Sequence, residues 1–177
     1  ESVIQFLRCN LTDITIEEID VLDNYLSATK VRGVKAYKND FAYEPDRFKG
    51  QLHYINDIRK RFADSLIEFY DLVKSESSAK AISESLYKLF NDYNVESKIE
   101  DKVIEYREAN NEIKAAEYSQ IYKIMISIID KIVTLLGDEI ISSRDYIDIM
   151  MSACEGAKIT TIPASDDSVV IGDLERT

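Results

Sequence analysis

The sequence predicts an all-α fold of about six helices, with a single short β-strand near the C-terminus. Three observations support this expectation. Only five glycines and two prolines interrupt 177 residues, 45% of the residues are hydrophobic, and apolar side chains recur every three or four positions over most of the chain. Few helix breakers and a repeat near 3.6 residues are typical of amphipathic helices that bury one face. The length is that of one domain with its own core.

The first half of the chain predicts two helices, a long connection and a longer helix. Residues 2–9 indicate the end of a helix. Thr15 and Glu18 have the spacing of a capping box, which predicts a helix over residues 16–28. Residues 29–50 contain two glycines and no clear period, so we expect an irregular connection. An apolar stripe then predicts an amphipathic helix over residues 51–74, formed by Leu52, Ile55, Ile58, Phe62, Leu66, Phe69 and Val73.

The second half predicts further helices and then the strand. Serines at 75, 77 and 78 precede a helix that ends near Tyr93, and two more helices are expected over residues 95–107 and 112–136. Gly137 is expected to end the longest helix in a left-handed conformation. Ser142 or Ser143 caps a last helix, which Gly156 closes. Residues 169–171 are predicted to form the strand. Its backbone N–H and C=O groups need a pairing strand, which we expect to lie outside this chain.

The charge of the chain is unevenly distributed. Its net charge of −11 argues against a general nucleic-acid binder. Between Lys30 and Arg61, however, nine bases and four acids give a local charge of +5, so the remaining residues carry −16. Lys30, Arg32, Lys35 and Lys38 alternate with apolar residues, and aromatic residues follow. This pattern fits contact with single-stranded nucleic acid, where rings stack on bases. It also fits a solvated loop whose aromatic rings pack on the helices, and both interpretations stay open.

The sequence lacks most motifs that would support catalysis, and although a pairing of a cysteine with His53 is formally possible, nothing in the sequence suggests it. The single histidine, His53, excludes sites built on two histidines, and the glycines form no phosphate-binding loop. Cys9 and Cys154 are far apart and match no metal or redox spacing. Acidic residues cluster at helical spacing, as on a solvated face. No apolar run is long enough to span a membrane. We therefore expect no catalytic residue, no metal site and no enzyme activity of this chain alone, and a reduced, cytoplasmic protein.

Both ends of the chain carry a family resemblance. The motifs are FLRCNLT at residues 6–12, IDVLDNYL at 19–26, VRG at 31–33, Ile-Pro at 162–163 and VVIGDLERT at 169–177. Together they resemble the B subunit of the bacterial ATP-dependent helicase/deoxyribonuclease family, of the AddAB or RexAB type.

The resemblance implies that this chain is part of a larger protein complex. The family's B subunit is similar to a superfamily 1 helicase with an inactive motor, followed by a nuclease domain. Together with an A subunit it forms a hydrolase with exonuclease activity. By the resemblance, this complex processes DNA double-strand breaks during recombinational repair. Residues 1–160 would then be the helical insertion (2B-like) of a UvrD-like lobe, and residues 161–177 the return to its core. An iron–sulfur cluster, Mg²⁺ and ATP would all be bound elsewhere in the parent, with no cofactor in this fragment.

These considerations predict a noncatalytic helical domain that contributes to a DNA channel or to subunit assembly. The alternative is a pure protein-interaction domain that contacts no DNA, only the A subunit. The candidate DNA contacts are Lys30, Arg32, Lys35, Lys38 and Arg176. By the resemblance, Asp173 and Glu175 would support the motif that faces DNA.

Overall fold

The structure is a computed structural model that describes residues 2–75 and 77–157. The all-α prediction is confirmed, with a minor β component. The described elements are α1 (Ser2–Arg8), α2 (Ile16–Thr29), the 3₁₀ turns η1 (Val34–Tyr37) and η2 (Asp46–Phe48), α3 (Leu52–Lys74), β1 (Ser77–Ser78), α4 (Ala79–Asp92), α5 (Val95–Glu108), α6 (Glu112–Leu136), β2 (Ile140–Ile141) and α7 (Ser143–Gly156). The predicted strand at residues 169–171 lies outside the described residues, as does the whole segment 161–177.

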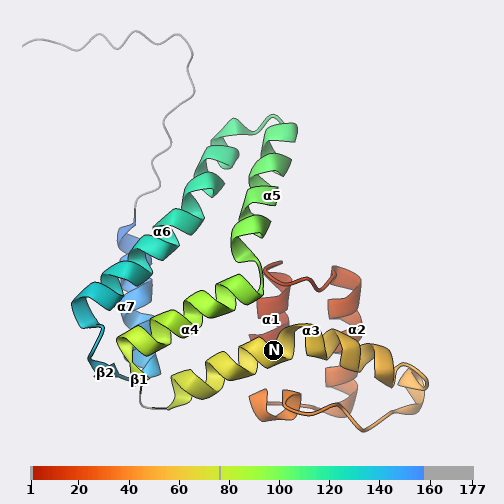
Figure 1. The fold of residues 1–177 in the computed structure, drawn as a ribbon. Coiled ribbons are helices and arrows are strands. Elements are labelled where there is room, and N and C mark those ends of the chain that lie inside the picture. The colour runs from red at the N-terminus through yellow and green to blue at the C-terminus, as the bar shows by residue number, and fades with distance from the viewer. Residues whose placement is uncertain (1, 76, 158–177) are drawn as a thin grey trace, which may run out of the picture.

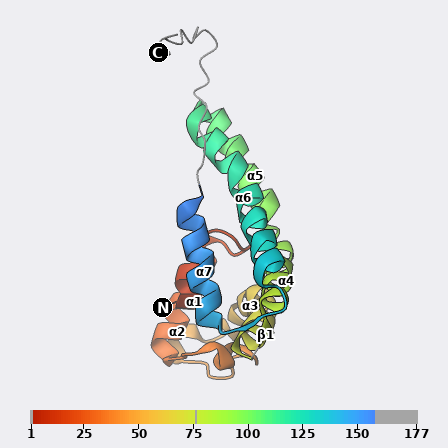
Figure 2. The same ribbon diagram turned by 90° about the vertical axis from the view of Figure 1, so that its left-hand side faces the viewer.

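The helices form two groups joined by α4. Figure 1 shows α1, α2 and the first half of α3 on one side, with α6 and α7 on the other. Helices α5 and α6 form an antiparallel hairpin that extends away from α1–α3, which gives the molecule the elongated outline seen in Figure 2.

The N-terminal core lies between α1, α2, the loop after α2, and α3. Tyr25 and Phe62 are its largest fully buried side chains. The ring of Tyr25 lies 5.1 Å from that of Phe41 and 5.5 Å from that of Phe48, measured between centroids. Such offset and edge-on ring pairs contribute beyond the apolar area that they bury.

The C-terminal core is smaller and mostly aliphatic. It joins Ile82 of α4, Ile128 and Ile132 of α6, and Tyr146 of α7. The hydroxyl of Tyr146 lies 2.9 Å from that of Ser83, so these two buried polar groups satisfy each other. The C-terminal end of α4 instead packs into the N-terminal core, which makes this helix common to both cores.

The predicted helix starts are confirmed by their caps. The Thr15 hydroxyl accepts from the amide of Glu18 at 3.3 Å, and the Glu18 carboxylate accepts from the amide of Thr15 at 2.9 Å. Ser78 caps α4 and Ser142 caps α7 in the same way, at 3.2 and 3.1 Å. Local side-chain acceptors therefore satisfy the amides that a helix start leaves open.

The prediction for Gly137 is wrong. Its φ of −49° is right-handed, so the residue continues the helical path beyond α6. A Cβ there would lie 2.4 Å from the carbonyl oxygen of Val133, which explains the glycine by close approach instead of by a left-handed turn. The connection from α6 to α7 runs against the start of α4, where the amide of Lys80 donates to the Gly137 carbonyl at 2.9 Å.

A two-stranded antiparallel ladder secures this junction. Ser77 pairs with Ile141, and Ser78 pairs with Ile140. The amide of Ala79 extends the contact by donating to the carbonyl of Glu139 at 2.9 Å. Strand partners far apart in sequence thus satisfy amides in the first turn of α4.

Candidate nucleic-acid interface

The basic loop, residues 30–50, leaves α2 through an unusual backbone. Lys30 adopts a left-handed conformation with φ 57°, which ends the helix. Gly33 and Gly50 have φ values of 82° and 79°, a region that side chains with a Cβ rarely occupy. These positions bend the chain at both ends of the loop, and the two 3₁₀ turns shape the path between them.

Three of the loop's aromatic rings are buried in the N-terminal core. Tyr37, Phe41 and Phe48 are each only 5–6% exposed, whereas Tyr43 is 67% exposed. The interpretation in which the aromatic residues pack on the helices therefore holds for these three. They anchor the loop, and only the ring of Tyr43 is open for stacking.

Two buried polar side chains of α3 form hydrogen bonds with the backbone of the loop. The side chain of Asn56 accepts from the amide of Phe41 at 2.7 Å and donates to its carbonyl at 3.0 Å. Arg59, whose side chain is 4% exposed, donates to the carbonyl of Tyr37 at 2.7 Å and also to the carboxylate of Asp40. The hydrogen bond from Arg59 lowers the pKa of Asp40 below its ordinary value. Loop backbone that would otherwise be buried without partners is thus satisfied.

Several bases of the positive stretch are committed to partners inside the fold. Lys38 pairs with Asp71 at 2.5 Å, and Arg61 pairs with Glu18. Lys60 lies 3.5 Å from the carboxylate of Asp40. The guanidinium of Arg47 lies 5.6 Å from the ring centroid of Phe48.

The remaining cations face solvent. Within residues 2–75 and 77–157, four bases of the stretch besides Arg47 are exposed and take part in no ion pair: Lys30, Arg32, Lys35 and Lys49. Three of the four loop residues predicted from the sequence therefore remain open to an outside anion, while Lys38 is shared with α3. Arg176, Asp173 and Glu175 lie outside the described residues.

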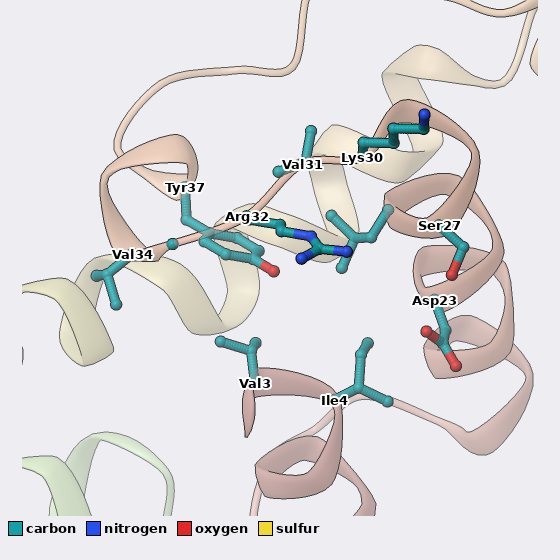
Figure 3. Close-up of a pocket in the computed structure, with 11 residues that line it drawn as sticks. Val3, Ile4, Asp23, Ser27, Lys30, Val31, Arg32, Val34 and Tyr37 are labelled. Atoms are coloured by element: carbon teal, nitrogen blue, oxygen red, sulfur yellow. The ribbon is translucent and has the colours of Figure 1, made fainter. Parts of the chain in front are cut away.

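A groove of about 570 Å³ opens beside these cations (Figure 3). Its walls come from the start of α1, the C-terminal half of α2 and the first residues of the loop, and they include Val3, Ile4, Asp23, Arg32, Val34 and Tyr37. The predicted cations Lys30 and Arg32 are brought together here. Nothing in the sequence indicates that Asp23 and Tyr37 join them, because the groove forms only when α1 packs beside α2.

The electrostatics of the groove are mixed. Burial raises the pKa of Tyr37, and the nearby carboxylate of Asp23 raises it further, so this phenol stays protonated at neutral pH. Asp23 itself lies 3.8 Å from the guanidinium of Arg8. The groove thus combines the cations Lys30 and Arg32 with a half-exposed carboxylate and a phenol.

Two absences in the described part of the chain bear on its chemistry. It contains no group of three or more His, Cys, Asp or Glu residues arranged to hold a metal ion. None of its helices is long and apolar enough to cross a membrane.

Comparison with curated proteins identifies relatives along the full chain. No model of a known protein family matches. A protein of Lachnoclostridium phytofermentans, named as the B subunit of an ATP-dependent helicase/deoxyribonuclease, is 32% identical over 100% of this chain. Proteins of the same name from Clostridium novyi and Clostridium botulinum (strain Loch Maree) are 30% and 32% identical over 99% of it. This chain is related to those B subunits. It spans about 16% of the length of these helicase/deoxyribonuclease relatives.

Proposed function

We propose that this chain is a noncatalytic helical region of a helicase/deoxyribonuclease B subunit, and that its basic loop contacts DNA. The observation that carries the proposal is the set of exposed, unpaired cations Lys30, Arg32 and Lys35. They lie on one short segment between the end of α2 and Tyr37, where the first of the bonds from buried α3 side chains holds the loop backbone.

Fixing the loop matters for binding. A charge on a mobile segment loses conformational entropy when it meets its ligand, whereas a charge on an anchored segment loses less. Cations that already pair with acids must also give up that partner before they meet a phosphate. Neither cost is expected for Lys30, Arg32 and Lys35, because their segment is anchored next to Tyr37 and they have no ion-pair partner among the described residues. Each can therefore release counterions from DNA and contribute to affinity.

The wider role follows from the relatives' name and from the resemblance of the terminal motifs. We place residues 1–160 in the helical insertion of a helicase-like lobe and residues 161–177 in the return to its core. The parent would act in the cytoplasm with an A subunit on DNA double-strand breaks. Its ATP, Mg²⁺ and iron–sulfur cluster would be bound elsewhere, because a four-cysteine cluster cannot be built from the two cysteines of this chain.

A surface on α7 supports the alternative, a protein-interaction role with the A subunit. Ile147 and Met151 are exposed on the side of α7 that turns away from the buried Tyr146. Exposed neighbouring apolar side chains are typical of protein contact surfaces.

Binding of labelled single-stranded DNA of about 16 nucleotides, measured by fluorescence anisotropy, tests the DNA proposal. The wild type is compared with the triple charge reversal Lys30→Glu, Arg32→Glu and Lys35→Glu. The matched control, Lys123→Glu, Lys131→Glu and Arg144→Glu, changes the total charge equally on exposed positions of α6 and α7.

We expect the loop reversal to abolish binding and the control to retain most of it. Equal, negligible binding by all three proteins, in a wild type that still captures the A subunit, would favour the interaction role and overturn the DNA proposal.

A further inference from the structure

The groove beside the basic loop is lined by the ring of Tyr37, whose hydroxyl is accessible from the groove. Tyr37 is only 6% exposed, yet its hydroxyl makes no hydrogen bond within the described part of the chain. Figure 3 shows this hydroxyl directed into the groove. Because the rest of the residue is enclosed by the fold, the groove is the place where this hydroxyl can meet a water molecule or a polar atom of a ligand.

Two charged groups of opposite sign share the groove with this hydroxyl. The side chain of Arg32 extends from the loop toward α2, and the carboxylate of Asp23 extends from α2 on the facing side (Figure 3). No ion pair joins Arg32 to Asp23. Asp23 has only the distant contact with Arg8, so most of its accepting capacity is open.

The rest of the lining is mixed, because it includes Ser27 and Lys30 as well as apolar residues. Val3 and Ile4 of α1 and Val34 of the loop form the opposite wall. The volume of about 570 Å³ falls within the range of about 300–1,000 Å³ that is usual for small-molecule sites. A ligand suited to this groove has an anionic group for the cations, a part that packs against Val3 and Ile4, and both a hydrogen-bond donor for Asp23 and an acceptor for Tyr37.

We propose that the groove binds one nucleotide of single-stranded DNA with the base inserted and a preference for cytosine. The phosphate would lie at Arg32 and Lys30, and the ring against Val3 and Ile4. The carboxylate of Asp23 accepts from the cytosine amino group, the pairing that acidic side chains make with this base. The phenol of Tyr37 donates to the base carbonyl. This inference rests on the proposed DNA contact, and it adds the insertion of a base and the identity of that base.

Base insertion explains why a single strand is the ligand. The edge of cytosine that Asp23 and Tyr37 would contact is occupied by the paired base in a duplex. Sequence-selective recognition of single strands uses these open edges. The loop cations alone would bind either form of DNA.

The test compares oligo-dC with oligo-dT of about eight nucleotides, a length within the usual single-strand site size. We expect the wild type to bind oligo-dC about tenfold more tightly, and Asp23→Ala to remove this preference. The ratio of the two affinities is the readout, because loss of a negative charge strengthens binding to both oligonucleotides. Asp20→Ala is the matched control, since it removes the same charge from α2 at a residue paired with Arg8 outside the groove.

A second variant, Tyr37→Phe, removes only the unpartnered hydroxyl. We expect about threefold weaker binding of both oligonucleotides with an unchanged thermal unfolding midpoint, because the hydroxyl has no partner in the fold. This measurement separates a role in binding from a role in stability.

The outcomes distinguish this inference from the proposal on which it rests. Should Asp23→Ala and Tyr37→Phe leave both affinities and their ratio unchanged while the triple loop reversal abolishes binding, the loop contacts DNA and the groove does not. Failure of the wild type to bind any oligonucleotide would overturn both. Loss of A-subunit capture by Asp23→Ala, with an unchanged dC to dT ratio, would assign the groove to a protein partner and overturn the inference.

Discussion

The N-terminal core holds a loop in place, whereas the C-terminal core holds helices together. In the first, aromatic rings from the loop insert between α2 and α3, and Asn56 and Arg59 satisfy the loop backbone. In the second, aliphatic side chains of α4, α6 and α7 meet directly, and the buried hydrogen bond joins only Ser83 and Tyr146. Buried polar groups are costly unless paired, so their concentration beneath the loop indicates that a defined loop conformation is being maintained.

The cores also differ in what they leave at the surface. Above the N-terminal core, the anchored loop exposes Lys30, Arg32 and Lys35 next to a groove. Beside the C-terminal core, α7 exposes Ile147 and Met151. A positive surface and an apolar surface thus occur in different parts of one chain, and they correspond to the two candidate functions.

Removal of a central ring from the N-terminal core has the largest expected effect. Phe62→Ala leaves a cavity next to Tyr37, whose ring centroid lies 5.9 Å away, and we expect a loss of about 3–5 kcal/mol in the free energy of unfolding. Urea denaturation measures it. Tyr54→Ala on the same helix is the control, because Tyr54 is 46% exposed and should change stability by about 0.5 kcal/mol or less. Similar losses in both variants would contradict the assignment of this core.

The corresponding change in the C-terminal core is Ile82→Ala. Ile82 is fully buried between α4, α6 and α7, and we expect its truncation to lower the free energy of unfolding by about 2–4 kcal/mol. Because α4 belongs to both cores, urea should still unfold the variant in a single transition. Two separate transitions, seen by hydrogen exchange in α2 and α7, would show that the cores are independent.

Asn56→Leu tests the polar support of the loop. The substitution leaves the amide and carbonyl of Phe41 buried without their partner, so we expect a loss of about 1–3 kcal/mol in the free energy of unfolding. Asn24→Leu on the exposed face of α2 is the control. We also expect Asn56→Leu to weaken single-strand binding, because a loosened loop must be ordered on contact. Unchanged stability would show that the loop does not depend on this side chain.

The smallest expected effect is a pH dependence from Asp40. Its pKa is lowered in the folded state by the hydrogen bond from Arg59, so its stabilising effect is present above the ordinary value of 3.8. As pH falls through the lower folded-state pKa, the carboxylate takes up a proton and the stabilisation is lost. Urea midpoints of the wild type and Asp40→Asn should therefore differ near neutral pH and converge in acid. A difference that persists unchanged in acid would contradict the Arg59–Asp40 pairing.

The features predicted correctly from the sequence are local ones. The cap of α2 depends on Thr15 and Glu18, which are three residues apart, and the stripe of α3 repeats within one helix. The features that were missed depend on distant partners. Gly137 is explained by the approach of Val133, and Ser77 pairs with Ile141 across more than sixty residues of intervening chain.

The same distinction applies to the candidate site. In the sequence, Lys35 and Lys38 are equivalent members of one basic run, and only the fold brings Asp71 to Lys38. Burial of Tyr37 and Phe41 likewise separates anchoring rings from the exposed Tyr43. The positive charge was visible in the sequence, but which charges are open could not be read from it.

The salt dependence of single-strand binding tests most directly whether the unpaired loop cations carry the contact. Three phosphate contacts give log Kd against log salt concentration a slope of about 2 between about 50 and 200 mM salt. Lys30→Gln, Arg32→Gln and Lys35→Gln should each lower this slope by about 0.7, whereas Lys38→Gln, which removes a lysine paired with Asp71, should leave it unchanged. One common slope for the wild type and all four variants would contradict the account.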